Sequence, residues 1–142
     1  MIAWKEVQAG DELPALSIDV TATVIVAGAI ASRDFMPVHH DRDYANAQGA
    51  PDIFMNILST TGHCSRFLTD WTGPEAMITR LAIRLGVPTH PGTTLRFTGR
   101  VVGTSRDGVT GLVDVELKAT NDLGDHVTGT ATLSLPAAGV GS

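Results

Sequence analysis

The residues best suited to do chemistry stand together between positions 32 and 45, in the segment S-R-D-F-M-P-V-H-H-D-R-D-Y-A. Asp34 and His39 are five residues apart, with Pro37 between them. Because proline lacks a backbone donor and disfavours helix at the residue before it, the segment bends and can aim both side chains at one point. A carboxylate beside an imidazole can hold a water molecule, orient it and shuttle its proton. On spacing alone, a loop carboxylate that caps backbone amides near a solvated histidine is the commoner arrangement.

The other ionisable and sulfur-bearing residues predict structural roles. His39 and His40 look like a metal pair, but adjacent side chains in a turning segment point in different directions and no cluster completes a coordination shell, so we predict no metal site. Cys64 falls on an apolar helical stripe and is expected to be an inert core thiol. Asp41 and Asp43 are expected to brace the loop or to cap a short turn. The remaining histidines are expected to be surface or packing residues: His40, His63, His90 and His126.

Composition predicts that one globular domain, residues 1–142, positions this segment. The chain has 142 residues, of which 43% are apolar and 18% charged. Its net charge of −5 and its lack of a basic block disfavour a nucleic-acid partner or an anionic membrane surface. A single cysteine excludes an internal disulfide, and the cytoplasm is the expected compartment. The small-residue tail at 136–142 is expected to fray.

Residues 22–31, A-T-V-I-V-A-G-A-I-A, resemble the apolar core of a signal peptide. Acidic residues precede this run where a signal peptide would be positive, and ten residues are too few to cross a bilayer. We therefore predict that Val20 to Ala31 is a buried strand.

The second half of the chain predicts an antiparallel sheet. Apolar side chains occupy odd positions in four stretches: Leu81–Val87, Leu95–Val101, Val109–Leu117 and Val127–Leu135. Alternation with period two indicates half-buried strands. The connections contain H-P-G at 90–92, S-R-D-G at 105–108 and N-D-L-G-D at 121–125, and such short turns predict a meander.

The first half of the chain predicts one long helix from Ile53 to Trp71. Apolar residues recur there at intervals of three and four, Asp52 can cap the start, and Thr72-Gly73-Pro74 ends it. Its few charges predict burial on most sides. One long buried helix against five or six antiparallel strands is the α+β hot-dog architecture, in which two protomers usually join edge to edge.

The segment around Asp34 resembles the signature of the MaoC-like, (R)-specific enoyl-CoA hydratase family, S-x-D-x-N-P-x-H-x-D-x-x-Y-A. The chain has seven of its residues in register: Ser32, Asp34, Pro37, His39, Asp41, Tyr44 and Ala45. It also has the opening V-x-x-G-D-x-L-P at residues 7–14, and the resemblance extends to about residue 135. The resemblance implies that Asp34 and His39 are the catalytic pair of a hot-dog hydratase.

Two positions depart from the family pattern. The asparagine before the proline is Met36, and the usual H-G-M at the helix start is Met55-Asn56-Ile57. In the family the backbone N–H of that glycine receives the thioester oxygen, so the resemblance implies that the Asn56 N–H could serve as the oxyanion donor. The Asn56 side chain is then expected to crowd the site.

The altered helix start resembles the small hot-dog subunit of actinobacterial heteromeric hydratases that act on steroid side-chain enoyl-CoA thioesters. The matching strings are RDF-x-x-VHHDRD, DIF-x-NIL, TDW-x-GP, RLGVP and LGDHVT. This implies that the partner is a second MaoC-like subunit, although a homodimer is the other expectation. In either case at least a dimer is expected, because a single hot-dog sheet leaves an edge strand open.

Four arginines, Arg80, Arg84, Arg96 and Arg100, lie on the outward parity of two strands. A solvated sheet face explains them most simply. The alternative is that some of them, Arg80 and Arg84 first, meet the phosphates of coenzyme A.

The sequence therefore predicts a hydratase that adds water to a trans-2-enoyl-CoA thioester, with no metal or redox cofactor. One alternative is a hot-dog acyl-CoA thioesterase, which would need an acidic residue on the central helix, where only Asp52 and Asp70 stand near its ends. The other alternative is a structural subunit without activity.

Overall fold

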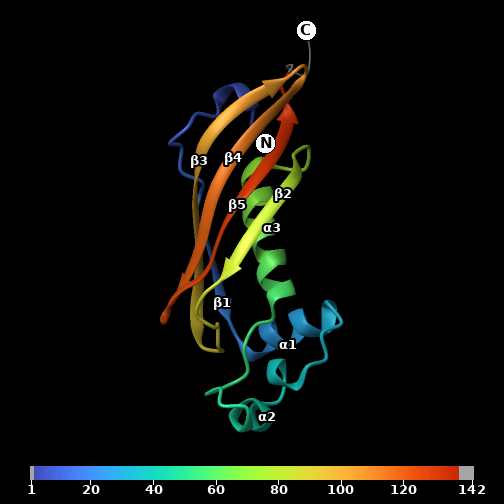
Figure 1. Cartoon of the computed structure of the whole chain (residues 1–142), viewed down its shortest axis with the longest axis vertical. Helices are drawn as coiled ribbons and strands as arrows, with labels where there is room; N and C mark the ends of the chain where they lie inside the picture. Colours follow the sequence, from blue (N-terminus) through green and yellow to red (C-terminus); the bar gives the residue numbers. More distant parts are fainter. Residues whose placement is uncertain (1, 138–142) are drawn as a thin grey trace.

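The computed structural model describes residues 2–137, and Figure 1 shows their arrangement. The elements in chain order are η1 (Trp4–Glu6), β1 (Leu16–Val20), α1 (Ala22–Ala31), η2 (Pro37–His39), α2 (Arg42–Ala47), α3 (Ile57–Thr72), β2 (Met77–Leu85), β3 (Thr93–Asp107), β4 (Thr110–Asn121) and β5 (Gly124–Pro136). The expected flexible tail lies outside the described residues, apart from Pro136 and Ala137.

The five strands form one antiparallel sheet in the order β1-β3-β4-β5-β2, which confirms the predicted antiparallel sheet. Its central strands keep the predicted alternation, since Val113, Val115 and Leu133 are buried while their neighbours along each strand are more exposed. Val109 breaks this pattern. It was predicted to face the core but is exposed, because it follows Gly108 (φ +60°) in the tight turn between β3 and β4.

The meander is correct for β3, β4 and β5 but wrong for β2, which pairs with β5 at the edge of the sheet. Beyond β2 the chain stays on β5, since the N–H groups of Gly86 and Val87 donate to the carbonyls of His126 and Asp125. The connection with the H-P-G turn must therefore carry the chain across the sheet to β3. Alternation identifies strands but carries no information on which strands pair.

Residues 22–31 form the helix α1, so the predicted buried strand from Val20 to Ala31 is wrong. The strand β1 ends at Val20, and Thr21 caps the helix by accepting a hydrogen bond from the Val24 N–H at 3.1 Å. An unbroken apolar run has no periodicity that separates a buried strand from a buried helix.

Small residues let α1 pack closely against α3. Ile25 and Ala29, four positions apart, are completely buried on the inner face of α1. A Cβ atom at Gly28 would lie only 2.2 Å from the Ser59 Oγ, so a larger residue here would force the Ser59 side chain to move. The small size of the alanines and the glycine in this run therefore serves a close helix–helix contact rather than a strand.

Helix α3 spans Ile57–Thr72 and begins later than the predicted Ile53–Trp71. Its N-cap is Asn56, whose side chain accepts a hydrogen bond from the Ser59 N–H, so the predicted capping role of Asp52 is wrong. Asp52 lies upstream of the helix, in a segment without regular secondary structure that leads into it.

One face of α3 packs against the sheet, and the core forms between them (Figure 1). The rings of Phe67 on α3 and Phe97 on β3 lie 5.8 Å apart in this core. The opposite face is not buried in the single chain, since Ile57 and Leu58 are 51% and 52% exposed. Burial along the whole helix is thus confirmed for one face only. A single long helix against one antiparallel sheet is the predicted hot-dog architecture.

The helices α1 and α2 gather at one end of the sheet, beside the N-terminus of α3 (Figure 1). Within residues 2–137, no helix is long and apolar enough to cross a membrane.

Candidate active site

Asp34 is positioned by the C-terminal end of α1. The Asp34 N–H donates to the Ala29 carbonyl at 2.9 Å and the Arg33 N–H to the Ile30 carbonyl at 3.0 Å, which are the paired bonds of a Schellman motif. Arg33 adopts the left-handed φ of +56° that this motif requires, a conformation that costs a residue with a Cβ about 1 kcal/mol. The helix therefore stops abruptly and places Asp34 directly beyond it.

His39 is positioned by the turn η2. Pro37 occupies the first position of η2, and the His39 N–H donates to the Met36 carbonyl at 3.1 Å. The Met36 N–H donates to the Asp34 Oδ1 at 3.2 Å, which closes the intervening loop. The His39 Nε2 consequently lies 3.3 Å from the Asp34 Oδ2, and the prediction that the proline bend aims both side chains at one point is confirmed.

The orientation of the His39 ring is fixed by its other nitrogen. The His39 Nδ1 lies 2.7 Å from the Phe54 carbonyl, and because a carbonyl can only accept, Nδ1 carries the hydrogen. The Phe54 ring packs edge-on against the imidazole with centroids 5.1 Å apart. In neutral His39 the Nε2 is then the basic nitrogen, and it faces the Asp34 carboxylate. The imidazole is buried, whereas the Asp34 side chain is 27% exposed, so the pair is reached from the side of Asp34.

The Asn56 side chain joins the pair to the start of α3. Its Nδ2 donates to the Asp34 Oδ2 at 3.1 Å and to the Ser32 Oγ at 2.9 Å. The hydrogen bond from Asn56, together with the Met36 N–H and the proximity of His39, holds the pKa of Asp34 below its ordinary value. The Asp34 carboxylate is therefore ionised at neutral pH.

Sequence reasoning missed this contact. It assigned a role to the backbone N–H of Asn56 and expected the side chain only to crowd the site. Among residues 2–137 no acceptor bonds to that backbone N–H. The signal that could have found the side-chain contact is asparagine itself, a preferred N-cap residue, had the helix start been placed at Ile57.

Asp41 has the predicted capping role, and Asp52, which was predicted to cap the long helix, forms an ion pair that braces the loop. Asp41 caps α2 by accepting from the Tyr44 N–H at 3.1 Å, while Asp43 lies in its first turn. Asp52 pairs with Arg42 at 3.0 Å, and this hydrogen bond lowers the pKa of Asp52. These contacts tie α2 to the segment that leads into α3.

Three other histidines are placed at the surface or in packing contacts. His40 is exposed beside the site. His63 is partly buried against Phe97, and burial lowers the pKa of this histidine. The Nδ1 of His90 lies 2.9 Å from the Ile53 carbonyl.

His126 and Cys64 are core residues. The His126 Nδ1 lies 2.7 Å from the Val87 carbonyl and its Nε2 lies 2.8 Å from the Thr60 Oγ1, and burial lowers the pKa of this histidine. Cys64 is completely buried, which raises the pKa of its thiol to about 11 and makes it inert at neutral pH, as predicted.

Within residues 2–137, no three His, Cys, Asp or Glu side chains are grouped so as to hold a metal ion.

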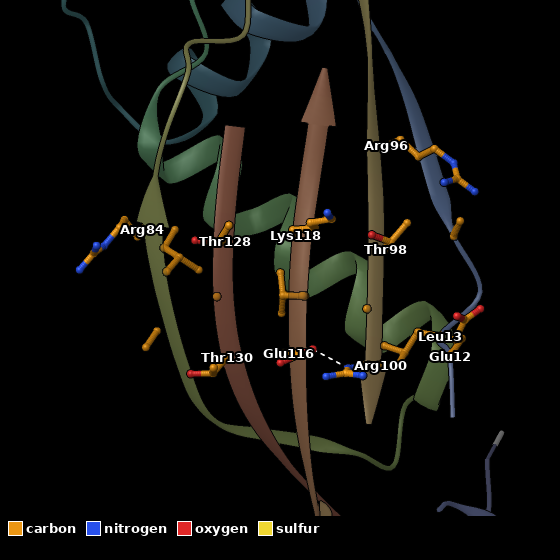
Figure 2. A pocket seen from close by; sticks show the side chains of 16 residues that line it. Glu12, Leu13, Arg84, Arg96, Thr98, Arg100, Glu116, Lys118, Thr128 and Thr130 are labelled. Carbon is orange, nitrogen blue, oxygen red and sulfur yellow. Dashed lines mark hydrogen bonds and ion pairs between the residues drawn. The ribbon is translucent and has the colours of Figure 1, made fainter. Parts of the chain in front are cut away.

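The outer face of the sheet, opposite α3, carries the four arginines predicted to point outward: Arg80, Arg84, Arg96 and Arg100. An open depression of about 1100 Å³ runs over this face, and Figure 2 shows Arg84, Lys118 and Arg96 around it. Arg100 forms an ion pair with Glu116, and Arg80 donates to the Thr130 Oγ1 at 3.2 Å. Neither Asp34 nor His39 lines the depression, so the single chain does not bring the arginines and the pair together.

The chain is similar in structure to known hot-dog proteins. A chain of the crystal structure of the ChsH1-ChsH2 complex from Mycobacterium tuberculosis superposes with a TM-score of 0.84 and is 48% identical, with 90% of this chain and 98% of that chain covered. The MaoC-like dehydratase from Rhodospirillum rubrum is 18% identical with a TM-score of 0.84, covering 99% of this chain and all of that chain (100%). At this identity the second likeness shows the fold alone.

Sequence similarity decides the family. No model of a protein family matches the chain. Over 126 residues, however, it is 48% identical to the 3-oxo-4,17-pregnadiene-20-carboxyl-CoA hydratase beta subunit of Mycobacterium tuberculosis (strain ATCC 25618 / H37Rv), covering 89% of this chain and 95% of that protein. The chain belongs to the MaoC-like hydratase family. The similarity to this relative and to the chain of the ChsH1-ChsH2 complex confirms the resemblance drawn from the segment around Asp34. It also confirms the likeness to the steroid-type small subunit.

Proposed function

We propose that the protein is an enoyl-CoA hydratase and the catalytic subunit of a hot-dog dimer or heteromer. The observation that carries the proposal is the convergence of the Asp34 Oδ2 and the His39 Nε2 at 3.3 Å, with the tautomer of His39 fixed by the Phe54 carbonyl. The relative's name and the family support hydration as the reaction.

In the proposed reaction one water molecule lies beside the contact of the Asp34 Oδ2 with the His39 Nε2, against both atoms. The His39 Nε2 takes a proton as the water oxygen forms a bond to C3 of the enoyl group. The electrons of the C2–C3 double bond move toward the thioester carbonyl and give an enolate. The His39 imidazolium, stabilised by the Asp34 carboxylate, then returns a proton to C2 on the same face, and the 3-hydroxyacyl-CoA leaves. Atoms and charge balance without a metal or a redox cofactor.

The enolate oxygen needs a hydrogen-bond donor, and we propose the backbone N–H of Asn56. This N–H lies at the N-terminus of the sixteen-residue helix α3, where the helix dipole favours negative charge. The coenzyme A portion belongs to the substrate. Arg80 and Arg84, on the edge strand β2, are proposed contacts for its phosphates.

A second protomer is proposed to cover the edge strand β2 and the outer face of α3. Exposed apolar side chains lie along these elements: Met77, Leu85, Ile57 and Leu58. An unpaired edge strand beside apolar surface is unfavourable in water, and pairing with another sheet removes both. The similar chain in the ChsH1-ChsH2 complex supports a different MaoC-like chain as the partner. The relative's name supports a bulky steroid side-chain thioester as the substrate.

A thioesterase is the second candidate, but the position of the carboxylates does not favour it. The only carboxylate on α3 is Asp70, which is exposed near its C-terminal end and pairs with Arg66. Asp52, ahead of the helix, is engaged by Arg42. Neither lies beside Asp34 and His39.

One experiment separates these functions and the structural-subunit alternative. The chain alone, and the chain mixed with a candidate MaoC-like partner, are sedimented and then incubated with short-chain and steroidal enoyl-CoA thioesters in water enriched in ¹⁸O. Mass spectrometry distinguishes an added labelled water from released free coenzyme A. We expect at least a dimer and labelled 3-hydroxyacyl-CoA, with the steroidal product formed only when the partner is present. Free coenzyme A as the main product would establish a thioesterase, and no product in any assembly would establish a structural subunit. Full steroidal activity without the partner would leave a self-sufficient homodimer, and a stable monomer would contradict the dimer.

A further inference from the structure

The Asn56 side chain uses every hydrogen-bonding group that it has. Its Oδ1 accepts from the Ser59 N–H at 3.1 Å, and its Nδ2 donates to the Ser32 Oγ at 2.9 Å and to the Asp34 Oδ2 at 3.1 Å. The residue is 2% exposed, so water cannot replace these partners. An amide with all its groups engaged in a buried place has one defined orientation.

Ser32 excludes the flipped orientation of this amide. The Ser32 Oγ donates its only hydrogen to carbonyls of α1, at 2.7 Å to Gly28 and 3.1 Å to Ala29, so toward Asn56 it can only accept. The Asp34 carboxylate also only accepts, and the Ser59 N–H only donates. The two acceptors must therefore face the Nδ2 and the donor must face the Oδ1.

The same amide connects two helix ends. Ser32 is the C-cap of α1 and Asn56 is the N-cap of α3, and the crossing of these helices is tight because Gly28 touches Ser59. One oxygen of the Asp34 carboxylate is thus held by the junction of two helices, and the other by its own loop. Met36, on that loop, contributes only its backbone N–H to Asp34.

We propose that the Asn56 side chain is a positioning residue, which holds the Asp34 carboxylate turned so that its Oδ2 faces the His39 Nε2. This inference rests on the proposed hydratase function and adds the residue that orients its carboxylate. Asn56 has two distinct tasks: its backbone N–H is the proposed oxyanion donor, and its side chain keeps the acid–base pair aligned. A helix cap alone would need only the Oδ1.

Two substitutions separate positioning from capping. Asn56→Asp keeps a strong N-cap oxygen for the Ser59 N–H but places a second carboxylate against Asp34. Like charges at this distance force the pair of carboxylates to share a proton, which raises the apparent pKa of Asp34. Asn56→Ser also keeps the cap but is too short to reach Asp34 and adds no charge. Gln8→Glu is the matched control, because it makes the same amide-to-carboxylate change at an exposed residue near the opposite end of the sheet.

The kinetic measurement is kcat and KM of the active assembly between pH 5 and 9, with the melting temperature of each variant. For Asn56→Ser we expect kcat to fall about tenfold at every pH, the equivalent of one hydrogen bond to a charged group, with KM little changed. For Asn56→Asp we expect a larger loss at pH 5 than at pH 8, because the acid limb of the profile moves to higher pH. Gln8→Glu is expected to keep the wild-type profile.

A second readout does not depend on activity. Carboxyl ¹³C titration of Asp34 in the folded chain is expected to move to higher pH in Asn56→Asp and to stay unchanged in Gln8→Glu. A wild-type titration and a wild-type profile in a folded Asn56→Asp variant would overturn the inference and leave Asn56 as a cap only. If no assembly hydrates enoyl-CoA but the titration still moves, the proposed function fails while the control of Asp34 by Asn56 stands.

Discussion

Charged side chains gather in two regions of this molecule, and the two differ in how they are held. At the helical end, the Asp34 carboxylate accepts hydrogen bonds from Asn56 and from the Met36 N–H, and it lies against a buried His39 whose tautomer is fixed. On the outer face of the sheet the cations stand around an open depression. Arg84 and Lys118 have no hydrogen bond to any of the residues 2–137 through their side chains.

The difference lies in the supporting structure rather than in the number of charges. Each group at the helical end is fixed by a helix terminus, a proline turn or a backbone carbonyl, so its position does not depend on solvent. Long exposed side chains on a sheet face keep their rotamer freedom and remain hydrated. Chemistry that needs sub-ångström alignment is therefore expected at the first region, and long-range attraction of an anion at the second.

The sharpest way to break this comparison is to remove the pair. Asp34→Asn and His39→Ala are each expected to lower hydration by at least about 10²-fold in the active assembly, the usual scale for a positioned acid or base. Circular dichroism and melting temperature of the same samples check that the variants are folded. Near-normal turnover in either folded variant would remove the pair from the mechanism and leave the ordered end of the molecule without a chemical role.

An outer-face substitution sharpens the comparison from the other side. Arg84→Ala is expected to raise KM for the enoyl-CoA about three- to tenfold and to leave kcat unchanged, because an exposed guanidinium contributes to binding but not to the chemical step. Steady-state kinetics at two salt concentrations measure it, since screening should reduce the difference between variant and wild type. The matched control is Arg106→Ala, an exposed arginine at the far end of β3. Equal effects of the two substitutions would mean that Arg84 acts only through net charge.

The two regions also differ in how much of their structure could be predicted from the sequence. The alternation of Val113 and Val115 with exposed neighbours depends on one local rule, so the strands and the outward parity of the arginines were predictable. The spacing of Asp34 and His39 around Pro37 also predicted convergence correctly. The segment 22–31 was predicted wrongly because an apolar run has no period, and its helix depends on a tertiary contact between Gly28 and another element.

The contact of Asn56 with Asp34 was not predictable for a related reason. It joins residues 22 positions apart and depends on where two helices end, and the start of α3 was predicted several residues too early. The pairing of β2 with β5 likewise depends on global topology. Local patterns therefore predicted the four strands of the second half and the convergence of Asp34 with His39, but not β1 or the helix junction that orients the pair.

The buried histidine His126 makes the free energy of unfolding depend on pH. Burial lowers the pKa of His126, so the unfolded chain binds a proton that the folded chain does not, and stability must fall as the pH drops below the unfolded pKa of 6.5. We expect the urea midpoint at pH 5.5 to lie below that at pH 7.5. His126→Asn is expected to reduce this difference, although it also loses packing at both pH values, so the comparison is the pH dependence within each variant. If the pH dependence is unchanged in His126→Asn, then other groups cause it. His63 is the first of these to test, since burial lowers the pKa of that histidine too.

We expect the smallest effect on stability from the ion pair of Arg100 with Glu116, which lines the depression on the outer face. Arg100 and Glu116 lie on neighbouring strands, and both side chains are about half exposed or more, at 61% and 48%. An exposed pair gains little Coulomb energy in water and costs side-chain entropy, so a double-mutant cycle of Arg100→Ala and Glu116→Ala is expected to give a coupling within about 0.5 kcal/mol. Urea unfolding of the four proteins at low salt measures it. A coupling of several times this size would mean that the pair is held as rigidly as Asp34 and His39, and the outer face would then have to be treated as an ordered site rather than a hydrated one.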